Sequence, residues 1–217
     1  MKIHAKPNNN FTSVLLLFIK AKFSENNKMQ LFTTCKYIQI LVWFDKIKEF
    51  RGKKILEIAP GFGRITQFLS ILADELIVVD LNPLCIEKTR EKLGHHVLAY
   101  FVNDGKSLSN IRDNSQDLVF SYDSFVHMHA NVIDSYVGEI YRVLKPGGTS
   151  FIHHSWIYGG SENSFENSAG RANMSPEQFK EIVEKHDLEI VSQNGIRFNE
   201  LNGWDGMDCI SIFRKKQ

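Results

Sequence analysis

A glycine-containing loop directly after an apolar run is the feature of this sequence best suited to hold a ligand. The run Ile55–Ile58 ends at Ala59-Pro60-Gly61-Phe62-Gly63, and a helix-like segment follows from Arg64 to Leu72. Glycine lets the backbone approach a ligand without an interposed Cβ atom. The N-terminus of the helix offers N–H groups and the positive end of its dipole. This strand, loop and helix predict a site for a nucleotide-like ligand.

Asp80 ends the next apolar run, roughly 20 residues after the loop, where nucleotide-binding α/β folds place an acidic residue on the ribose. A carboxylate suits this task because it accepts hydrogen bonds from both ribose hydroxyls. A lone Asp at the end of a strand can instead cap a turn, but the loop beside it favours the ribose role. The dinucleotide pattern G-x-G-x-x-G is not met, because Thr66 stands where the third glycine is required.

A second group of polar side chains follows the fourth and fifth expected strands, namely Asp123, His127, His129, His153 and His154. The carboxyl edge of an α/β sheet is where ligands bind. His127 or His154 is a candidate general base, and packing against a cofactor or a loop carbonyl is the alternative for His127. His153 and His154 point to opposite sides of a strand, so at most one faces the cleft easily. No helical pair at i, i+4 supports a metal site, and we predict none.

Alternating strands and helices must position these residues, which predicts a mostly parallel sheet covered on both faces. A broad apolar stripe predicts a helix over Gln30–Phe50. The expected strands are 54–58, 76–80, 97–102, 118–121, 149–153, 188–193 and 208–213. The other expected helices are 64–72, 83–93 with Asn82 as N-cap, 132–144, and one begun by the capping box Ser175–Gln178 and ending near His186.

Length and composition agree with one domain, residues 29–217, preceded by an extension at 1–28. The net charge of +1 gives no reason to expect nucleic acid or membrane as a partner. The three cysteines form no close pair, which fits a reducing cytoplasm, and no segment reaches the roughly 20 apolar residues of a membrane span. The segments 1–6 and 11–19 resemble a signal peptide, but Lys20, Lys22 and the lack of a small-residue cleavage site argue against secretion.

Five motifs in order resemble the class I S-adenosylmethionine-dependent methyltransferases over about three quarters of the chain. These are EIAPGFGR at 57–64, VVD with NP at 78–83, NDG at 103–105, DLVFSYDSFVH at 117–127 and YRVLKPGG at 141–148. The resemblance implies a Rossmann-like, doubly wound seven-stranded sheet with an antiparallel last strand. It also implies S-adenosyl-L-methionine as cofactor. The residues implied to bind it are Glu57, Ala59, Gly61, Gly63, Asp80, Leu81, Asp104, Gly105 and Ser121. Ala59 departs from the family, since many members have glycine there.

A polar insert at 155–174, rich in glycine and asparagine, follows the fifth expected strand. A loop of this length is usually functional or disordered, and we interpret it as a lid on the substrate side. Trp156, Tyr158 and Arg171 are its expected contacts, and Arg171 suits an anionic or polyhydroxyl group. A solvated surface loop with Trp156 packed into the core is the alternative. With Asp123, we take Trp156 and Arg171 as candidate substrate-binding residues.

The resemblance extends to small bacterial methyltransferases linked with sugar-containing products. It therefore implies methyl transfer to a small-molecule acceptor, and we expect a hydroxyl oxygen. A nitrogen or protein acceptor is the alternative, although no Asn-Pro-Pro-Tyr stretch follows the fourth strand. A non-catalytic cofactor-binding or scaffold protein is a further alternative, suggested by the N-terminus and Ala59. Thr66 and the KPGG turn disfavour a nicotinamide-dependent oxidoreductase. The oligomeric state is not predicted.

Overall fold

The computed structural model of this chain describes residues 47–159, 170–198 and 206–217. The chain divides into two compact units, residues 1–49 and 50–217. The expected extension at 1–28, its boundary and most of the helix expected at Gln30–Phe50 lie outside the described residues. The end of that helical span forms the short 3₁₀ turn η1, Lys48–Phe50.

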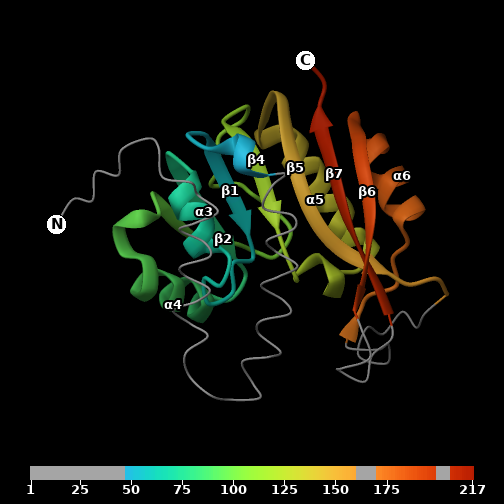
Figure 1. Cartoon of the computed structure of the whole chain (residues 1–217), viewed down its shortest axis with the longest axis horizontal. Helices are drawn as coiled ribbons and strands as arrows, with labels where there is room; N and C mark the ends of the chain where they lie inside the picture. The colour runs from blue at the N-terminus through green and yellow to red at the C-terminus, as the bar shows by residue number, and fades with distance from the viewer. Residues whose placement is uncertain (1–46, 160–169, 199–205) are drawn as a thin grey trace. The chain divides into compact units, whose positions relative to one another are not determined.

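Residues 50–217 are built on one seven-stranded sheet in the order β3-β2-β1-β4-β5-β7-β6 (Figure 1). Strands β1 to β5 pair in parallel, and β7 runs antiparallel to both β5 and β6. This confirms the expected Rossmann-like sheet with an antiparallel last strand. The strands are β1 Lys54–Ile58, β2 Glu75–Asp80, β3 Ala99–Val102, β4 Gln116–Ser121, β5 Leu144–Trp156, β6 Leu188–Phe198 and β7 Gly206–Lys215.

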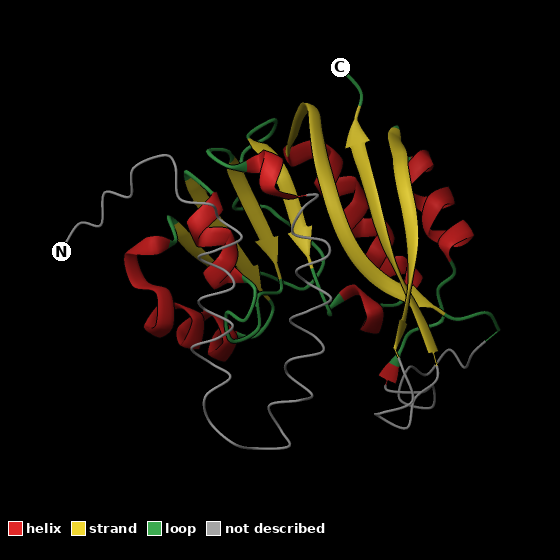
Figure 2. Ribbon diagram, in the orientation of Figure 1, coloured by secondary structure: helices red, strands yellow, loops and turns green. Residues whose placement is uncertain are grey.

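In the described part of the chain, four helices flank the sheet, with α3 and α4 beside β1 to β3 and α5 and α6 beside β5 to β7 (Figure 2). The helices are α3 Thr66–Leu72, α4 Pro83–Leu93, α5 Ala130–Val143 and α6 Pro176–Lys185, and η2 Gly94–His96 and η3 Phe125–His127 are short 3₁₀ turns. The predicted caps are confirmed, because Asn82 accepts the Leu84 N–H and Ser175 forms a capping box with Gln178. Helix α3 is shorter than expected, with seven residues.

The KPGG segment Lys145–Gly148 forms an irregularity inside β5 instead of a turn before it. Gln116 pairs with Leu144, whereas Leu118 pairs with Thr149, so the segment bulges out of the ladder between them. A Cβ atom on Gly148 would lie 2.9 Å from the Lys145 carbonyl oxygen, which explains the glycine. The strand consequently begins earlier and ends later than the predicted 149–153.

The apolar core on the α5 and α6 side joins these helices to the central strands. Ile133 and Ile140 of α5, Phe179 of α6 and Phe213 of β7 are fully buried in one cluster. Each such side chain contributes roughly 1.5–3 kcal/mol by leaving water. This core fixes the strands whose carboxyl ends, those of β1, β2 and β4, face one edge of the sheet (Figure 1).

Candidate active site

The loop after β1 is shaped by three residues in the left-handed backbone region. Ala59, Gly61 and Gly63 have φ values of 57°, 55° and 70°. The Ala59 N–H donates to the Val79 carbonyl at 2.7 Å, which ties the start of the loop to β2. A Cβ atom on Gly63 would approach the Thr89 methyl group to 3.2 Å, so glycine also permits close packing against α4.

Ala59 adopts a conformation that glycine tolerates better, because a Cβ atom in the left-handed region meets the neighbouring carbonyl. We therefore expect Ala59→Gly to relieve about 1 kcal/mol of backbone strain in the folded state. The greater freedom of glycine in the unfolded chain offsets part of this gain, so the free energy of unfolding should rise by less than that amount. Urea unfolding of both proteins measures the difference. Destabilisation by Ala59→Gly would show that the alanine methyl group packs favourably there.

Asp80, at the end of β2, holds the glycine loop through its carboxylate. Its Oδ2 accepts the Gly61 N–H at 3.2 Å, and its Oδ1 accepts the Asn82 N–H at 2.8 Å. On the other side of the loop, Thr89 of α4 donates its hydroxyl to the Gly61 carbonyl at 2.7 Å. Burial raises the pKa of Asp80, while the two backbone hydrogen bonds oppose that rise. The predicted loop and acidic residue thus form one connected unit.

Glu57 lies in β1, one residue before its end, and is 2% exposed. Its Oε2 has no hydrogen-bond partner among the described residues. Burial raises the pKa of Glu57 to about 8, with smaller opposing effects from the Thr66 hydroxyl and the cations Arg64 and Lys92. Without a ligand, this side chain therefore carries a proton at neutral pH.

His154 is fully buried on the face of β5 that packs against α6. Its ring stacks on Phe179 of α6 with centroids 4.0 Å apart, and its Nε2 lies 2.8 Å from the Ser211 hydroxyl. Burial lowers its pKa to about 3, so the imidazole is neutral. The structure therefore contradicts the prediction that His154 can act as a general base toward a ligand, because both ring nitrogens are engaged inside the core.

Glu57 and His154 have opposite effects on how stability depends on pH. The pKa of His154 is depressed on folding, so stability is lost as pH falls below about 6.5. The pKa of Glu57 is raised, so stability is lost as pH rises from 4.5 toward 8. Between about pH 5 and 6.5 the two slopes, each at most about 1.4 kcal/mol per pH unit, offset one another.

Glu57→Gln removes one of these slopes and leaves the other. We expect the variant to lose about 1–2 kcal/mol of stability on acidification from about pH 6.5 to 5, while the wild type changes little. Urea unfolding at a series of pH values measures this, with the exposed substitution Glu91→Gln as control. Parallel pH profiles for wild type and Glu57→Gln would contradict the assignment.

The remaining predicted cofactor residues differ in their surroundings. Leu81 is 61% exposed and lies beside Gly105, where a Cβ atom would approach the leucine to 3.3 Å. Asp104 is exposed, and its Oδ1 accepts the backbone N–H groups of Lys106 and Ser107. Ser121 is fully buried and donates to the Ile58 carbonyl at 2.9 Å, so its hydroxyl joins β4 to β1 instead of facing a ligand.

On the opposite side of the edge, Asp123 is the centre of a charged group. Its Oδ2 accepts a hydrogen bond from Arg64 at 2.9 Å, and its Oδ1 lies 3.9 Å from the Arg171 guanidinium. Asp123 has a φ of 62°, and its backbone N–H donates to His153 Nδ1 at 3.0 Å. Asp123 therefore connects the end of the glycine loop to the segment that follows β5.

His127, in η3, is exposed, and its Nδ1 lies 2.8 Å from the Gly170 carbonyl oxygen. A carbonyl only accepts hydrogen bonds, so Nδ1 carries a hydrogen in this contact, and in the neutral ring the lone pair is then on Nε2. This is the tautomer that a general base needs. The contact also matches the alternative that His127 packs against a loop carbonyl.

The described end of the insert, Gly170 to Met174, is part of the core and is not an exposed lid. Ala172 and Met174 are fully buried, and the Ala172 N–H donates to the Val126 carbonyl at 2.8 Å. Arg171 binds Asp208 with both Nε and Nη2, at 3.2 and 2.7 Å. The middle of the insert, 160–169, lies outside the described residues. At the other end, Trp156 is half-buried and Tyr158 is exposed.

Sequence reasoning missed three participants at this site: Arg64, Tyr122 and Asp208. Asp208 is fully buried, and burial would raise its pKa, but hydrogen bonds from His153 and Arg171 outweigh this and lower it. An acidic residue between the apolar neighbours Met207 and Cys209 is a signal that could have indicated a buried ion pair. Among the described residues, no group of three or more His, Cys, Asp or Glu side chains is arranged to hold a metal ion.

Comparisons with known proteins match the part of the chain that carries this site. The family profile described as "Methyltransferase domain" matches residues 56–152. A phosphoethanolamine N-methyltransferase from Triticum aestivum is 31% identical over 115 residues, which cover 52% of this chain and 23% of that protein. The chain thus spans about a quarter of the length of the first curated relatives it matches.

Solved structures share the fold at low identity. A putative methyltransferase from Bacillus halodurans has a TM-score of 0.67 and 16% identity, with 82% of this chain and 99% of that chain covered. The [4+2]-cyclase SpnF has a TM-score of 0.62 and 19% identity, with 79% and 80% covered. These similarities concern the fold, and SpnF shows that the fold also serves other chemistry.

The seven-stranded sheet, mostly parallel with one antiparallel strand, is that of the Rossmann-like methyltransferase fold. Residues 56–152 match the methyltransferase-domain profile, and this match together with the similar structures implies S-adenosylmethionine as the cofactor. No helix in the described part of the chain is long and apolar enough to cross a membrane.

Proposed function

We propose that this chain transfers a methyl group from S-adenosylmethionine to a small polar acceptor. The observation that carries the proposal is the hydrogen bond from the Gly61 N–H to the Asp80 carboxylate, which sets an acidic group and an open loop side by side. A Cβ atom on Gly61 would meet nothing within 4 Å, so the loop has room for a ligand on that side.

The residues at this edge fit the cofactor chemically. Asp80 would accept the ribose hydroxyls, and the exposed Leu81 would contact the apolar face of the adenine. Glu57, with its buried oxygen that lacks a partner among the described residues, would favour a cationic group above β1. When bound, the cofactor supplies an activated methyl group that an acceptor lone pair can attack in line. The protein's contribution is then to orient the acceptor and remove its proton.

Two acceptor classes follow from different observations. The relatives are named for transfer to the nitrogen of phosphoethanolamine, which supports an amine acceptor. The sequence predicted a sugar-like hydroxyl acceptor, and a hydroxyl depends more than an amine on a base that removes its proton. The Nε2 atom of His127, which is not used in the contact with Gly170, could be that base and so supports a hydroxyl acceptor. In both cases His127 would take the acceptor proton as the new bond to carbon forms.

An acceptor panel tests the proposal and separates these classes. The full chain is incubated with methyl-labelled S-adenosylmethionine and phosphoethanolamine, ethanolamine or a methyl hexoside, and the products are identified by mass spectrometry. Labelled product from any acceptor supports methyl transfer, and the labelled atom identifies the class. Cofactor binding without transfer to any of them would favour the non-catalytic alternative that the fold also permits.

A further inference from the structure

Tyr122, the residue directly after β4, has a buried hydroxyl group that the fold does not use. The side chain is 7% exposed, and its Oη has no hydrogen-bond partner within the described ranges. Leaving a buried hydroxyl without a partner costs free energy, and such groups are rare in folded proteins. An unused donor just after β4, at the carboxyl edge, is therefore a candidate for a contact with a ligand.

The ring of Tyr122 is held in place by a chain of buried contacts. It stacks on His153 with ring centroids 4.4 Å apart. The His153 Nδ1 accepts the Asp123 N–H, so its other nitrogen, Nε2, carries the hydrogen and lies 3.1 Å from Asp208. Arg171 holds Asp208 from the other side. This arrangement leaves the tyrosine ring little freedom to turn away.

The charges around Tyr122 are balanced. Arg64 pairs with Asp123 at 2.9 Å, and Arg171 pairs with Asp208 at 2.7 Å. All four charges are close enough to affect the pKa of Tyr122, although burial is the largest effect and raises it. The phenol therefore keeps its proton and acts as a donor. A balanced surrounding with one neutral donor suits an uncharged oxygen or nitrogen atom better than an ion.

We propose that Tyr122 is an acceptor-binding residue, whose hydroxyl donates a hydrogen bond to an uncharged oxygen or nitrogen atom of the methyl acceptor. The inference rests on the proposed function, because it assigns a contact to the acceptor of that reaction. Asp123 and Arg64, which are partly exposed beside it, form the polar rim of the same site.

Tyr122→Phe tests this assignment, because it removes only the hydroxyl. The acceptor used is the one that the wild type methylates among phosphoethanolamine, ethanolamine and a methyl hexoside. We expect its KM to rise about 3- to 10-fold, which corresponds to one lost hydrogen bond. The KM for S-adenosylmethionine should not change. Without ligand, the melting temperature should stay the same or rise, because an unpaired buried polar atom is removed.

Tyr100→Phe is the matched control, since that hydroxyl donates to the Gly94 carbonyl at 2.8 Å beside β3. It should leave both KM values unchanged. Turnover by Tyr122→Phe with an unchanged acceptor KM would overturn the inference alone, as would a melting temperature several degrees lower. Wild-type protein that transfers no methyl group to any acceptor would overturn the proposed function and this inference with it.

Discussion

Asp80→Ala is expected to weaken S-adenosylmethionine binding by about 2–4 kcal/mol, or roughly 30- to 1,000-fold. Two effects combine in this loss. The ribose hydroxyls lose their charged acceptor, and the Gly61 and Asn82 N–H groups lose the carboxylate that positions the loop. Isothermal titration calorimetry of the full chain measures the change.

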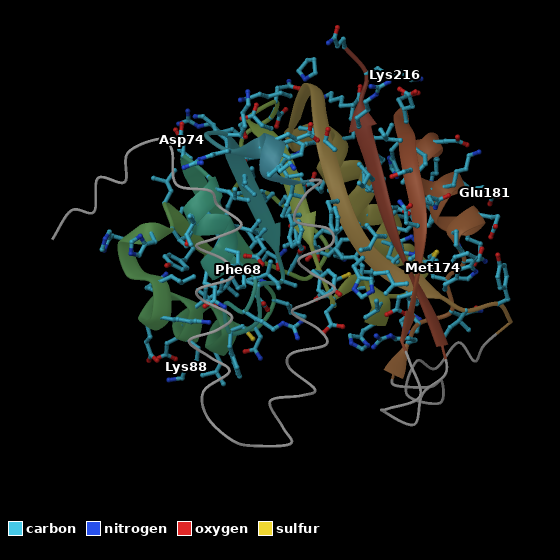
Figure 3. All side chains as sticks on the ribbon, viewed as in Figure 1. Phe68, Asp74, Lys88, Met174, Glu181 and Lys216 are labelled. Carbon is cyan, nitrogen blue, oxygen red and sulfur yellow. The ribbon has the colours of Figure 1, made fainter. Side chains whose placement is uncertain are left out.

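Asp74→Ala is the matched control, because Asp74 is an exposed carboxylate just before the opposite end of β2. Figure 3 labels it near the upper edge of the view, away from the carboxyl ends of the strands. It should leave the affinity within a factor of about two, as expected for a distant surface charge in salt. Equal affinities of Asp80→Ala and wild type would refute the ribose assignment.

Arg171→Met is expected to destabilise the fold by about 3–5 kcal/mol, because it leaves the Asp208 carboxylate buried with one ionic partner removed. Asp208 is fully buried in β7, and Arg171 binds both of its oxygens. Adding Asp208→Leu to the same protein should recover much of the loss, because the unpaired charge then disappears. Urea unfolding of the single and double variants gives the free energies.

Arg214→Met is the control for this pair. Arg214 binds Glu189 across β7 and β6 at 2.9 Å, but both side chains are about half exposed. Its loss should cost at most about 1 kcal/mol, since exposed ion pairs contribute little. If Arg171→Met costs no more than Arg214→Met, then the buried pair does not anchor the segment after β5.

The strands and capped helices could be predicted because local patterns determine them. Asn82-Pro83 and Ser175–Gln178 mark helix starts through side-chain hydrogen bonds to nearby N–H groups, which depend on a few neighbouring residues. The bulge at Lys145–Gly148 was predicted as a turn, because its glycines indicate a break in regular structure. That it lies within the ladder depends on pairing with β4, which the local sequence does not encode.

The two sides of the site also differ in how well the local sequence predicts them. The loop at Ala59–Gly63 and Asp80 could be predicted together, because their spacing in the sequence reflects one strand-to-strand connection. The choice between His153 and His154 depends on which face of β5 turns toward Asp123, and the prediction named His154 as the candidate base. His153 contacts the site, whereas His154 packs on α6.

Arg171 was predicted as a substrate contact within a lid, because the insert around it is polar and follows the fifth expected strand. Its partner Asp208 is 37 residues further along the chain and in a different strand. The local sequence does not identify the partner in such a long-range pair, so only the tertiary structure reveals the pairing. The same limit applies to Tyr122, whose unused hydroxyl is evident only from its buried surroundings.

Titration of the full chain with S-adenosylmethionine in a calorimeter tests the central claim most directly. The account predicts saturable binding at one site per chain, competed by S-adenosylhomocysteine and weakened by Asp80→Ala but not by Asp74→Ala. Folded protein that binds neither compound would contradict it.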